Sequence, residues 1–255
     1  MSGFSSPFKN GTRVVNGYLL DRVSCEYRIG ERIHPVFSAI NLNISLDRIT
    51  VVLGKSGCGK TTLLRLLAGL LQPTSGEIIF VKNGAAITPK VGMVFQESRL
   101  FPWLSVRDNI TIHRKKDRDS LAIQQKYLSM MGLEEFAAAY PSQLSGGMSQ
   151  RIAIARALAY EPDILLMDEP FSALDYFTRL QMQDEILKIF HTLGIGIVFV
   201  THNVEEALML ATDLLVLKYQ AAPVRFELPN QGSPDSNENQ AVQLKKQILE
   251  LLKES

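Results

Sequence analysis

A glycine-rich loop sets the architecture of this chain: Gly54-Lys55-Ser56-Gly57-Cys58-Gly59-Lys60-Thr61. An apolar run, Ile49–Leu53, comes directly before the loop, and a helical pattern over Lys60–Leu70 follows it. The spacing G-x-x-x-x-G-K-[ST] between a buried strand and a helix is typical of a phosphate-binding loop. Its glycines let backbone N–H groups turn toward phosphate oxygens, and the helix N-terminus adds a partial positive charge. We therefore expect residues 54–62 to bind the phosphates of a nucleotide.

Individual side chains of this loop have separate expected roles. Lys60 would contact the β- and γ-phosphates, and the hydroxyl of Thr61 would bind Mg²⁺, with Thr62 next to it on the same helix. Cys58 is expected to be a tolerated small residue and not a nucleophile, because no histidine or acid is forced near it. The alternative, a glycine-rich turn that matches by chance, is disfavoured because strand and helix are both in register.

Apolar runs alternate with helical patterns along most of the chain. Further candidates for buried strands are Val91–Phe95, Ile164–Met167, Ile197–Val200 and Leu214–Leu217. Continuous apolar runs of this length are typical of parallel strands covered on both faces. An amphipathic pattern from Met182 to Leu193 predicts a helix packed on the sheet. The alternation predicts an α/β fold with a mostly parallel sheet.

Three other segments do not follow this alternation of apolar runs and helical patterns. Between Tyr18 and Leu46, apolar and polar residues alternate with the period of a strand. Residues 97–163 carry several helical patterns and no convincing strand, which predicts a helical insertion between two core strands. Pro229–Gln240 is rich in Asn, Ser, Pro and Gly and predicts a linker, and Leu244–Leu252 predicts a short amphipathic helix.

The composition excludes several classes of protein. The chain has 255 residues, of which 46% are hydrophobic, and its net charge is +1, so neither wholesale disorder nor nucleic-acid binding is expected. Two cysteines, Cys25 and Cys58, cannot form a disulfide framework, which favours a reducing compartment. No apolar run approaches the roughly 18 residues of a membrane span, and the first residues lack the apolar core of a signal peptide. We expect a soluble, intracellular protein.

Two carboxylates follow the apolar run Ile164–Met167. A strand that ends in Asp168-Glu169 places both side chains at the carboxyl edge of a parallel sheet, where ligands bind. Asp168 could hold magnesium there, and Glu169 could orient or deprotonate a water molecule. The alternative is a solvated strand end, which the phosphate loop makes less plausible.

A second glycine-containing segment is Leu144-Ser145-Gly146-Gly147-Met148, directly before a helical pattern. Ser145 is suited to cap that helix, and the two glycines would let a phosphate approach its N-terminus. As a bare pattern this is mostly turn chemistry, so its position relative to the other motifs carries more weight.

Six motifs occur in a characteristic order over residues 18–218: the phosphate loop, Gln96 after an apolar run, Leu144–Met148, Asp168-Glu169, Ser172–Asp175 and Thr201-His202. This set resembles the ATP-binding-cassette (ABC) ATPases, the nucleotide-binding subunits of ABC transporters. The resemblance implies a P-loop NTPase core with a mostly parallel sheet, an N-terminal antiparallel β subdomain and a helical insertion. It also implies one domain over residues 18–228, with the helical subdomain at about 97–163, followed by a linker and short helix at 229–255.

The resemblance further implies roles for residues that bind nucleotide. Tyr27 would stack on adenine, and Gln96 would join the magnesium shell and sense a membrane partner. Ser145, Gly146 and Gly147 match the family's signature motif, which meets the γ-phosphate bound to the opposite subunit.

The resemblance also supplies the catalytic assignments. Glu169 would be the catalytic carboxylate and His202 the switch histidine that contacts the γ-phosphate. Asp175 would be the D-loop aspartate, and Asp168 would hold magnesium together with Thr61 and Gln96. The implied cofactors are ATP and Mg²⁺.

Three segments resemble a narrower group, the importers of nitrate, sulfonates and taurine. These segments are the run Arg99–Trp103, the signature motif that ends in Met148, and residues 169–175. This resemblance implies a homodimer that lies peripherally on the cytoplasmic face of the inner membrane and energises an integral-membrane permease. An extracytoplasmic solute-binding protein would complete the system. Thiamine-precursor uptake systems share these features, so the solute stays open. Asn203 departs from the family, whose members usually carry Asp after the switch histidine, and its effect on the switch stays open.

Two other functions remain as alternatives. A soluble cassette ATPase of DNA repair or translation usually fuses two cassettes or contains a long coiled coil, and copurification with a permease would exclude it. A P-loop kinase of small metabolites needs no Leu144–Met148 motif and would release a phosphorylated product.

Overall fold

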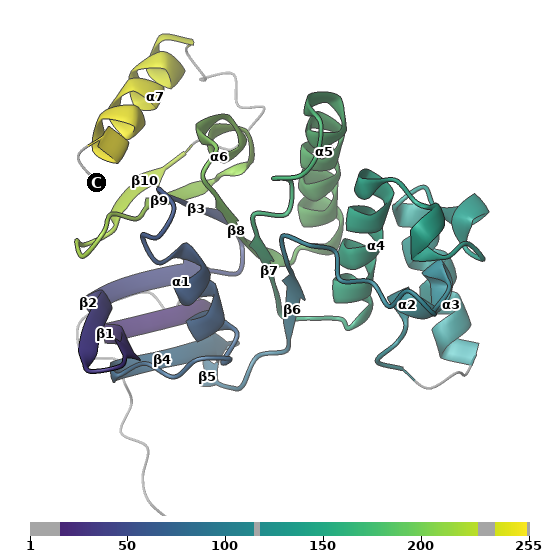
Figure 1. The fold of residues 1–255 in the computed structure, drawn as a ribbon, viewed down its shortest axis with the longest axis horizontal. Helices are drawn as coiled ribbons and strands as arrows, with labels where there is room; N and C mark the ends of the chain where they lie inside the picture. The colour runs from purple at the N-terminus through teal and green to yellow at the C-terminus, as the bar shows by residue number, and fades with distance from the viewer. Residues whose placement is uncertain (1–15, 115–117, 229–237, 254–255) are drawn as a thin grey trace, which may run out of the picture.

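The computed structural model of the chain describes residues 16–114, 118–228 and 238–253. Most of the predicted linker, residues 229–237, therefore lies outside the described residues. Figure 1 shows two sheets, with helices gathered around the larger one. Within the described ranges, no helix combines the length and the apolar character needed to cross a membrane.

The larger sheet has six strands in the order β10-β9-β3-β8-β7-β6. Their bounds are β3 (Ile49–Leu53), β6 (Val91–Val94), β7 (Ile164–Asp168), β8 (Gly196–Thr201), β9 (Asp213–Val216) and β10 (Val224–Glu227). Every pairing is parallel except that of β10 with β9. The predicted mostly parallel sheet is confirmed, and all residues of β3, β8 and β9 are buried, as continuous apolar runs predict.

The smaller sheet is antiparallel, with strand order β2-β1-β4-β5. Its strands are β1 (Gly17–Ile29), β2 (Arg32–Ser45), β4 (Ser75–Lys82) and β5 (Ala85–Ala86). The alternation between Tyr18 and Leu46 thus belongs to β1 and β2, whose inward residues, such as Ile40 and Ile44, are buried. This sheet is the predicted N-terminal antiparallel subdomain.

Seven α-helices and two short 3₁₀ helices are described. The α-helices are α1 (Lys60–Leu67), α2 (Val106–Ile110), α3 (Arg118–Met130), α4 (Gly146–Ala159), α5 (Tyr176–Leu193), α6 (Val204–Leu210) and α7 (Glu238–Lys253). The 3₁₀ helices span Glu134–Phe136 and Pro141–Gln143. Between β6 and β7 the described residues form only helices and loops, as expected of a helical insertion. The predicted helix Lys60–Leu70 ends earlier, because Gly69 adopts a left-handed conformation with φ 68°.

Each face of the larger sheet is covered by its own layer. One hydrophobic cluster joins α1 and the smaller sheet to one face, through residues such as Leu63, Leu166 and Val198. The other cluster joins the opposite face to α4, α5, α6 and α7. Covering both faces leaves the carboxyl ends of β3, β7 and β8 as the accessible edge, where sites of open parallel sheets form.

Candidate functional site

The phosphate loop connects β3 to α1, as predicted. Gly59 is the N-cap of α1 at φ 105°, and Gly57 has φ 84°. A Cβ on Gly59 would lie 2.6 Å from Cγ1 of Val36, so both conformation and space require glycine there. The loop therefore turns directly into the N-terminus of α1, where backbone N–H groups favour an anion.

Lys60 is buried at the start of α1, with 6% of its surface exposed. Its Nζ donates hydrogen bonds to the carbonyl oxygens of Gly54 (2.9 Å) and Lys55 (3.0 Å). The same ammonium lies 3.4 Å from Oε1 of Glu169. The loop thus holds one cation at its centre, beside a carboxylate from the end of β7.

Thr61 and Asp168 bring two oxygen atoms together. The hydroxyl of Thr61 donates to Oδ1 of Asp168 at 3.2 Å. Burial raises the pKa of the Asp168 carboxyl, and the Thr61 hydrogen bond acts in the opposite direction. A hydroxyl and a carboxylate are the oxygen ligands that suit Mg²⁺.

Glu169 occupies an unusual backbone position directly after β7. Its φ of 44° lies in the left-handed region, and its N–H donates to the carbonyl of Val200 at 3.0 Å. Its Oε2 lies 2.8 Å from Nδ1 of His202, which follows β8. A strained non-glycine residue at a strand end is a frequent feature of functional sites, and here it aims a carboxylate at the Lys60 ammonium and the His202 imidazole.

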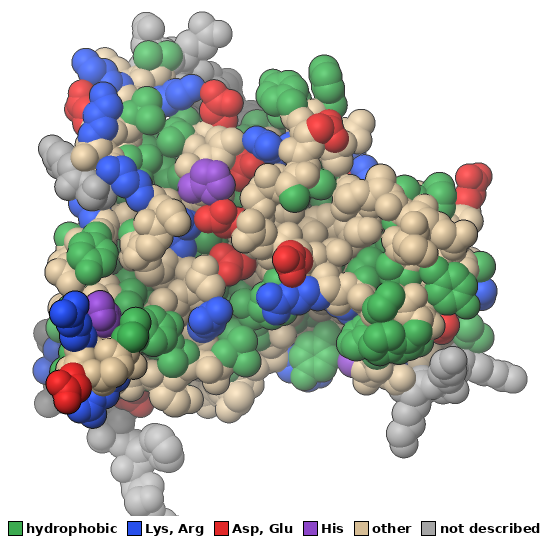
Figure 2. Space-filling view, in the orientation of Figure 1, with side chains coloured by type: hydrophobic (Ala, Val, Ile, Leu, Met, Phe, Trp, Pro, Cys, Tyr) green, Lys and Arg blue, Asp and Glu red, His purple; other side chains and the backbone are tan. Residues whose placement is uncertain are grey.

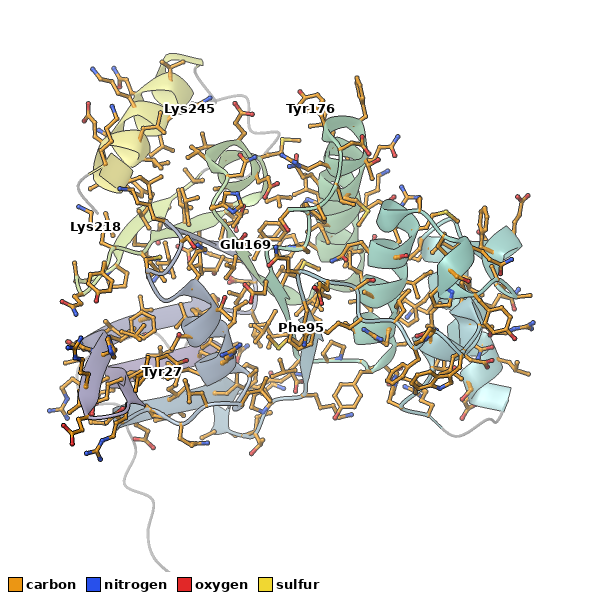
Figure 3. The ribbon with its side chains drawn as sticks, in the orientation of Figure 1. Tyr27, Phe95, Glu169, Tyr176, Lys218 and Lys245 are labelled. Atoms are coloured by element: carbon orange, nitrogen blue, oxygen red, sulfur yellow. The ribbon has the colours of Figure 1, made fainter. Side chains whose placement is uncertain are left out.

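Glu169 and His202 line a pocket of about 440 Å³, together with Gly54, Lys55, Ser56 and Leu252. Figure 3 shows Glu169 near the middle of the view, above Tyr27 on the smaller sheet and Phe95, which follows β6. A nucleophile-orienting carboxylate, a histidine and a phosphate loop within one cavity form a site suited to phosphoryl transfer to water.

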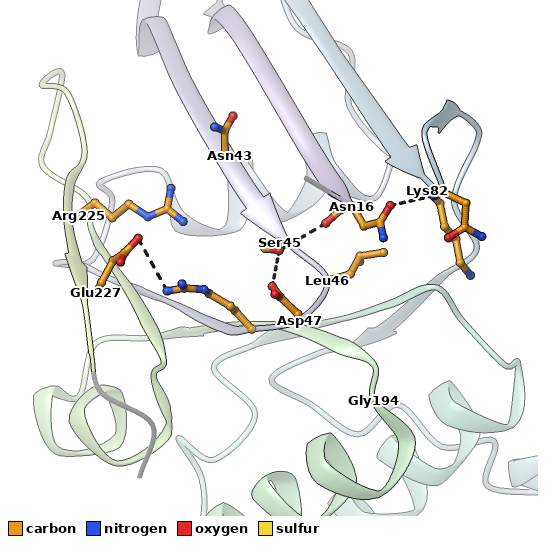
Figure 4. A pocket seen from close by; sticks show the side chains of 11 residues that line it. Asn16, Asn43, Ser45, Leu46, Asp47, Lys82, Gly194, Arg225 and Glu227 are labelled. Atoms are coloured by element: carbon orange, nitrogen blue, oxygen red, sulfur yellow. Dashed lines mark hydrogen bonds and ion pairs between the residues drawn. The ribbon is translucent and has the colours of Figure 1, made fainter. Parts of the chain in front are cut away.

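A larger pocket of about 700 Å³ lies elsewhere, between the smaller sheet and the β10 edge (Figure 4). Both arginines that line it are already paired: Arg48 with Glu227 at 3.8 Å, and Arg225 with Asp213 at 2.7 Å. Its lining contains none of the motif residues. Size alone therefore does not identify the functional site.

Tyr27 lies close to the phosphate loop. The residue belongs to β1, is half-buried, and its hydroxyl is 3.2 Å from Oγ1 of Thr62. The predicted proximity of this aromatic side chain to the nucleotide site is compatible with that position, while its stacking on adenine stays a prediction.

The structure keeps the other motif residues away from this pocket. Ser145, Gly146 and Asp175 are exposed at helix starts, and Gln96 is exposed after β6. Ser145 caps α4 by accepting from the N–H of Met148 at 3.2 Å, and Asp175 caps α5. None of these residues lines the pocket at the phosphate loop.

Close packing and one hydrogen bond fix the N-terminal half of α4. A Cβ on Gly147 would lie 2.6 Å from Cγ2 of Thr178, so α4 packs closely against α5. The buried Gln150 of α4 donates to the carbonyl of Phe95 at 3.4 Å, next to Gln96. The segment with Gln96 is thereby connected to the helix that begins with the signature motif.

The sequence analysis missed a buried polar cluster behind His202. Glu206 on α6, 5% exposed, accepts from the hydroxyl of Thr201 at 2.6 Å and lies 3.5 Å from Nε of Arg179 on α5. Arg179 also donates to the carbonyl of Leu174 at 3.0 Å. Helical spacing places Glu206 on the buried face of α6 with Ala207 and Leu210, which is the signal that could have identified it.

Asn203 has a clear local role. Its side chain accepts from the backbone N–H groups of Glu205 (2.8 Å) and Glu206 (3.3 Å) and so caps α6. Asn and Asp are about equally good N-caps, so the departure from the family at this position preserves the helix start.

Comparisons with known proteins agree with this geometry. The family model for ABC transporters matches residues 37–172. The taurine import ATP-binding protein of Roseobacter denitrificans is 41% identical over 213 residues, covering 80% of this chain and 78% of the relative. An aliphatic sulfonates import ATP-binding protein of Pseudomonas syringae pv. tomato is 44% identical over 196 residues, covering 77% and 82%.

A solved structure supports the same family assignment. A dimeric ATP-binding cassette in a post-hydrolysis state, bound to ADP and Pi, superposes with a TM-score of 0.72 at 31% identity, covering 84% of this chain and 99% of that one. The family model and the solved structure agree on the family and on the fold. The chain belongs to the ABC transporter family and is an ATP-binding, ATP-hydrolysing subunit of that family.

Proposed function

We propose that Glu169 and His202 carry out ATP hydrolysis at the end of the phosphate loop. The observation that carries this is the position of the Glu169 carboxylate, which lies 3.4 Å from Nζ of Lys60 and 2.8 Å from Nδ1 of His202, at a pocket that Glu169 and His202 line. Lys60 and the loop N–H groups would hold the phosphates. Glu169 would orient and deprotonate the attacking water, and His202 would contact the γ-phosphate.

Magnesium is part of the proposal. In the described part of the chain no cluster of three or more His, Cys, Asp or Glu side chains suits a metal. Mg²⁺ at nucleotide sites takes only one or two protein oxygens beside phosphates and water, which the Thr61–Asp168 pair can supply, with Gln96 as a further ligand. When bound, the ion would neutralise charge on the transferred phosphoryl group.

The complete site would need two copies of the chain. Ser145, Gly146, Gly147 and Asp175 do not line the pocket of their own chain, yet Ser145, Gly146 and Asp175 are exposed at helix starts, where backbone N–H groups are suited to phosphate. A second copy, arranged as in dimeric cassettes such as the solved relative, would bring them to the γ-phosphate.

The partner of the dimer would be an integral-membrane permease, with the chain peripheral on the cytoplasmic face of the inner membrane. Figure 2 shows hydrophobic side chains gathered over the α2–α3 end of the molecule. Trp103 belongs to this helical region and is 70% exposed, against the Phe101 ring. We propose that this surface receives a short cytoplasmic helix of the permease.

The transported solute would be a small anionic or zwitterionic compound such as a sulfonate, taurine or nitrate, captured outside by a solute-binding protein. The names of two similar proteins, taurine and aliphatic sulfonates import ATP-binding proteins, support this class. They also disfavour a soluble cassette without a permease.

Two measurements test the proposal. Lys60→Ala should abolish tight ATP binding in calorimetry, because a polyanionic ligand loses its main buried counter-charge. Arg65→Ala, an exposed cation on the same helix, is the control and should retain binding. Normal ATP affinity of the Lys60 variant would refute the phosphate-loop assignment.

The second measurement tests transport. Proteoliposomes that contain this chain with the copurified permease and binding protein should take up taurine, alkanesulfonates or nitrate only with ATP inside.

A further inference from the structure

The C-terminal helix α7 packs on the same edge of the molecule as the nucleotide site. It contacts α6 and β9 (Figure 1), and its own residue Ile248 is fully buried. Leu244, Leu251 and Leu252 extend this apolar stripe against the main core. Lys245, labelled in Figure 3, forms an ion pair with Glu205 of α6 at 3.1 Å.

The last turn of α7 reaches the pocket itself. Leu252 completes a lining whose other five members belong to the phosphate loop or follow β7 and β8. An isobutyl side chain has no group that can bind a phosphate. The C-terminal end of a helix also carries a partial negative charge, which disfavours a nearby polyanion. Leu252 therefore occupies space at this pocket and adds no affinity for nucleotide.

The pocket has another expected occupant on this side. In the proposed function, Ser145–Gly147 of a second copy must approach the phosphate bound at the loop. Docked α7 and that signature segment would both need the side of the pocket next to Glu169 and His202. Two chain segments cannot fill the same volume, so docking of α7 and closure of the dimer exclude each other.

We propose that α7 is an autoinhibitory helix, which competes with a second copy of this chain for the open side of the phosphate-loop pocket. The inference rests on the proposed intersubunit site. Bound nucleotide would place phosphates near the negative end of α7, which disfavours the docked helix. Nucleotide binding would also bring a second copy toward Leu252, which disfavours docking for steric reasons. Free chains would thereby hydrolyse ATP slowly, and assembly would release the inhibition.

The contacts suggest how to undock α7 without touching the catalytic residues. The Lys245–Glu205 pair is exposed, so its contribution to docking is small. Ile248 carries the largest share because it is fully buried, whereas its neighbour Leu249 is 41% exposed. Ile248→Asp should release the helix, and Leu249→Asp is a control of the same chemistry on the outer face.

The experiment measures ATP-dependent dimerisation of full-length chains by sedimentation, with Glu169→Gln in every chain to slow hydrolysis. Ile248→Asp should lower the dimer dissociation constant roughly ten-fold or more, which is the equivalent of one fully buried aliphatic side chain. Leu249→Asp should leave it unchanged. Hydrogen exchange should show faster exchange in α7 of the Ile248 variant and native protection in β3, β7 and β8.

A charge exchange supplies a second, gentler variant. Lys245→Glu should strengthen dimerisation about two- to five-fold, the range of an exposed ion pair, and adding Glu205→Lys should restore the original constant. Equal dimerisation of the Ile248 and Leu249 variants, with α7 undocked in the former, would overturn the inference. So would weaker dimerisation of Ile248→Asp, which would make α7 part of the interface. If the reference chain fails to dimerise at any ATP concentration, the proposed function fails as well.

Discussion

Nδ1 of His202 lies 2.8 Å from Oε2 of Glu169, which connects the ends of β8 and β7 directly. An ionised carboxylate only accepts hydrogen bonds, so Nδ1 of the imidazole is the donor and its tautomer is fixed. The other carboxylate oxygen faces Lys60 at 3.4 Å. Glu169 is therefore oriented from two sides, which supports the proposal that it positions a water molecule.

Glu169→Gln separates orientation from basicity. The amide oxygen can still accept from His202, so ATP binding should persist, whereas turnover should fall by about 10²-fold or more because the basic group is lost. The variant should accumulate an ATP-bound dimer in gel filtration. Turnover close to that of the unmodified chain would move the catalytic role elsewhere, with His202 as the first candidate.

Glu206→Gln tests the buried cluster behind His202. The amide retains an acceptor for Thr201 but removes a buried negative charge that the fold disfavours, so above the raised pKa of Glu206 the free energy of unfolding should rise. Misplacement of the β8 end should also lower kcat more than it raises KM. Urea unfolding and steady-state kinetics measure the two effects.

The same variant has a pH signature. Burial raises the pKa of the Glu206 carboxyl, while Thr201, Arg179 and His202 act in the opposite direction. A raised pKa means that the folded chain binds this proton more tightly than the unfolded chain, so stability falls as pH rises from the ordinary glutamate pKa through the raised one. Glu206→Gln should remove that slope. Parallel stability–pH curves for variant and unmodified chain would contradict the assignment.

Asn203 is predicted to act as a helix cap. Asn203→Ala should cost about 1 kcal/mol of unfolding free energy, because two N–H groups of α6 lose their acceptor. Asn203→Asp should stay within about 0.5 kcal/mol of the unmodified chain, since Asp caps equally well. Thermal and urea unfolding check both values, and equal losses for the two variants would refute the capping role.

Trp103 reports on the proposed permease surface, because it is the single tryptophan of the chain. At 70% exposure its emission should be red-shifted in the isolated chain and shift to the blue when the permease or its cytoplasmic-loop peptide binds. Trp103→Ala should weaken that association and leave ATP binding intact. Emission that does not change on complex formation would leave only a packing role for Trp103.

The strands of the larger sheet were predictable because burial on both faces demands continuous apolar runs, as in β3 and β8. Strands β4 and β10 could not be predicted from the sequence, for the opposite reason. Only part of β4 is buried, and β10 is a four-residue edge strand with no buried residue. A strand that contributes little to the core has a weak hydrophobic pattern.

The residues of the site also divide into those that the sequence could predict and those that it could not. Lys60, Glu169 and His202 could be brought together from the sequence because they follow neighbouring parallel strands, whose carboxyl ends share one edge. The roles of Leu252 and of the Arg179–Glu206 pair depend on which helices meet. An amphipathic pattern shows that a helix has an apolar face, but it does not show what that face covers.

We propose that each hydrolytic site is shared between two copies of the chain. The most direct test mixes a Lys60→Ala chain with a Ser145→Arg chain, each of which should be inactive alone. A mixed dimer then has one site with both lesions and one with neither. Activity should recover to roughly a quarter of the unmodified rate, since half of the dimers are mixed and each has one intact site. No recovery, despite heterodimers demonstrated by differential tagging, would contradict the shared site.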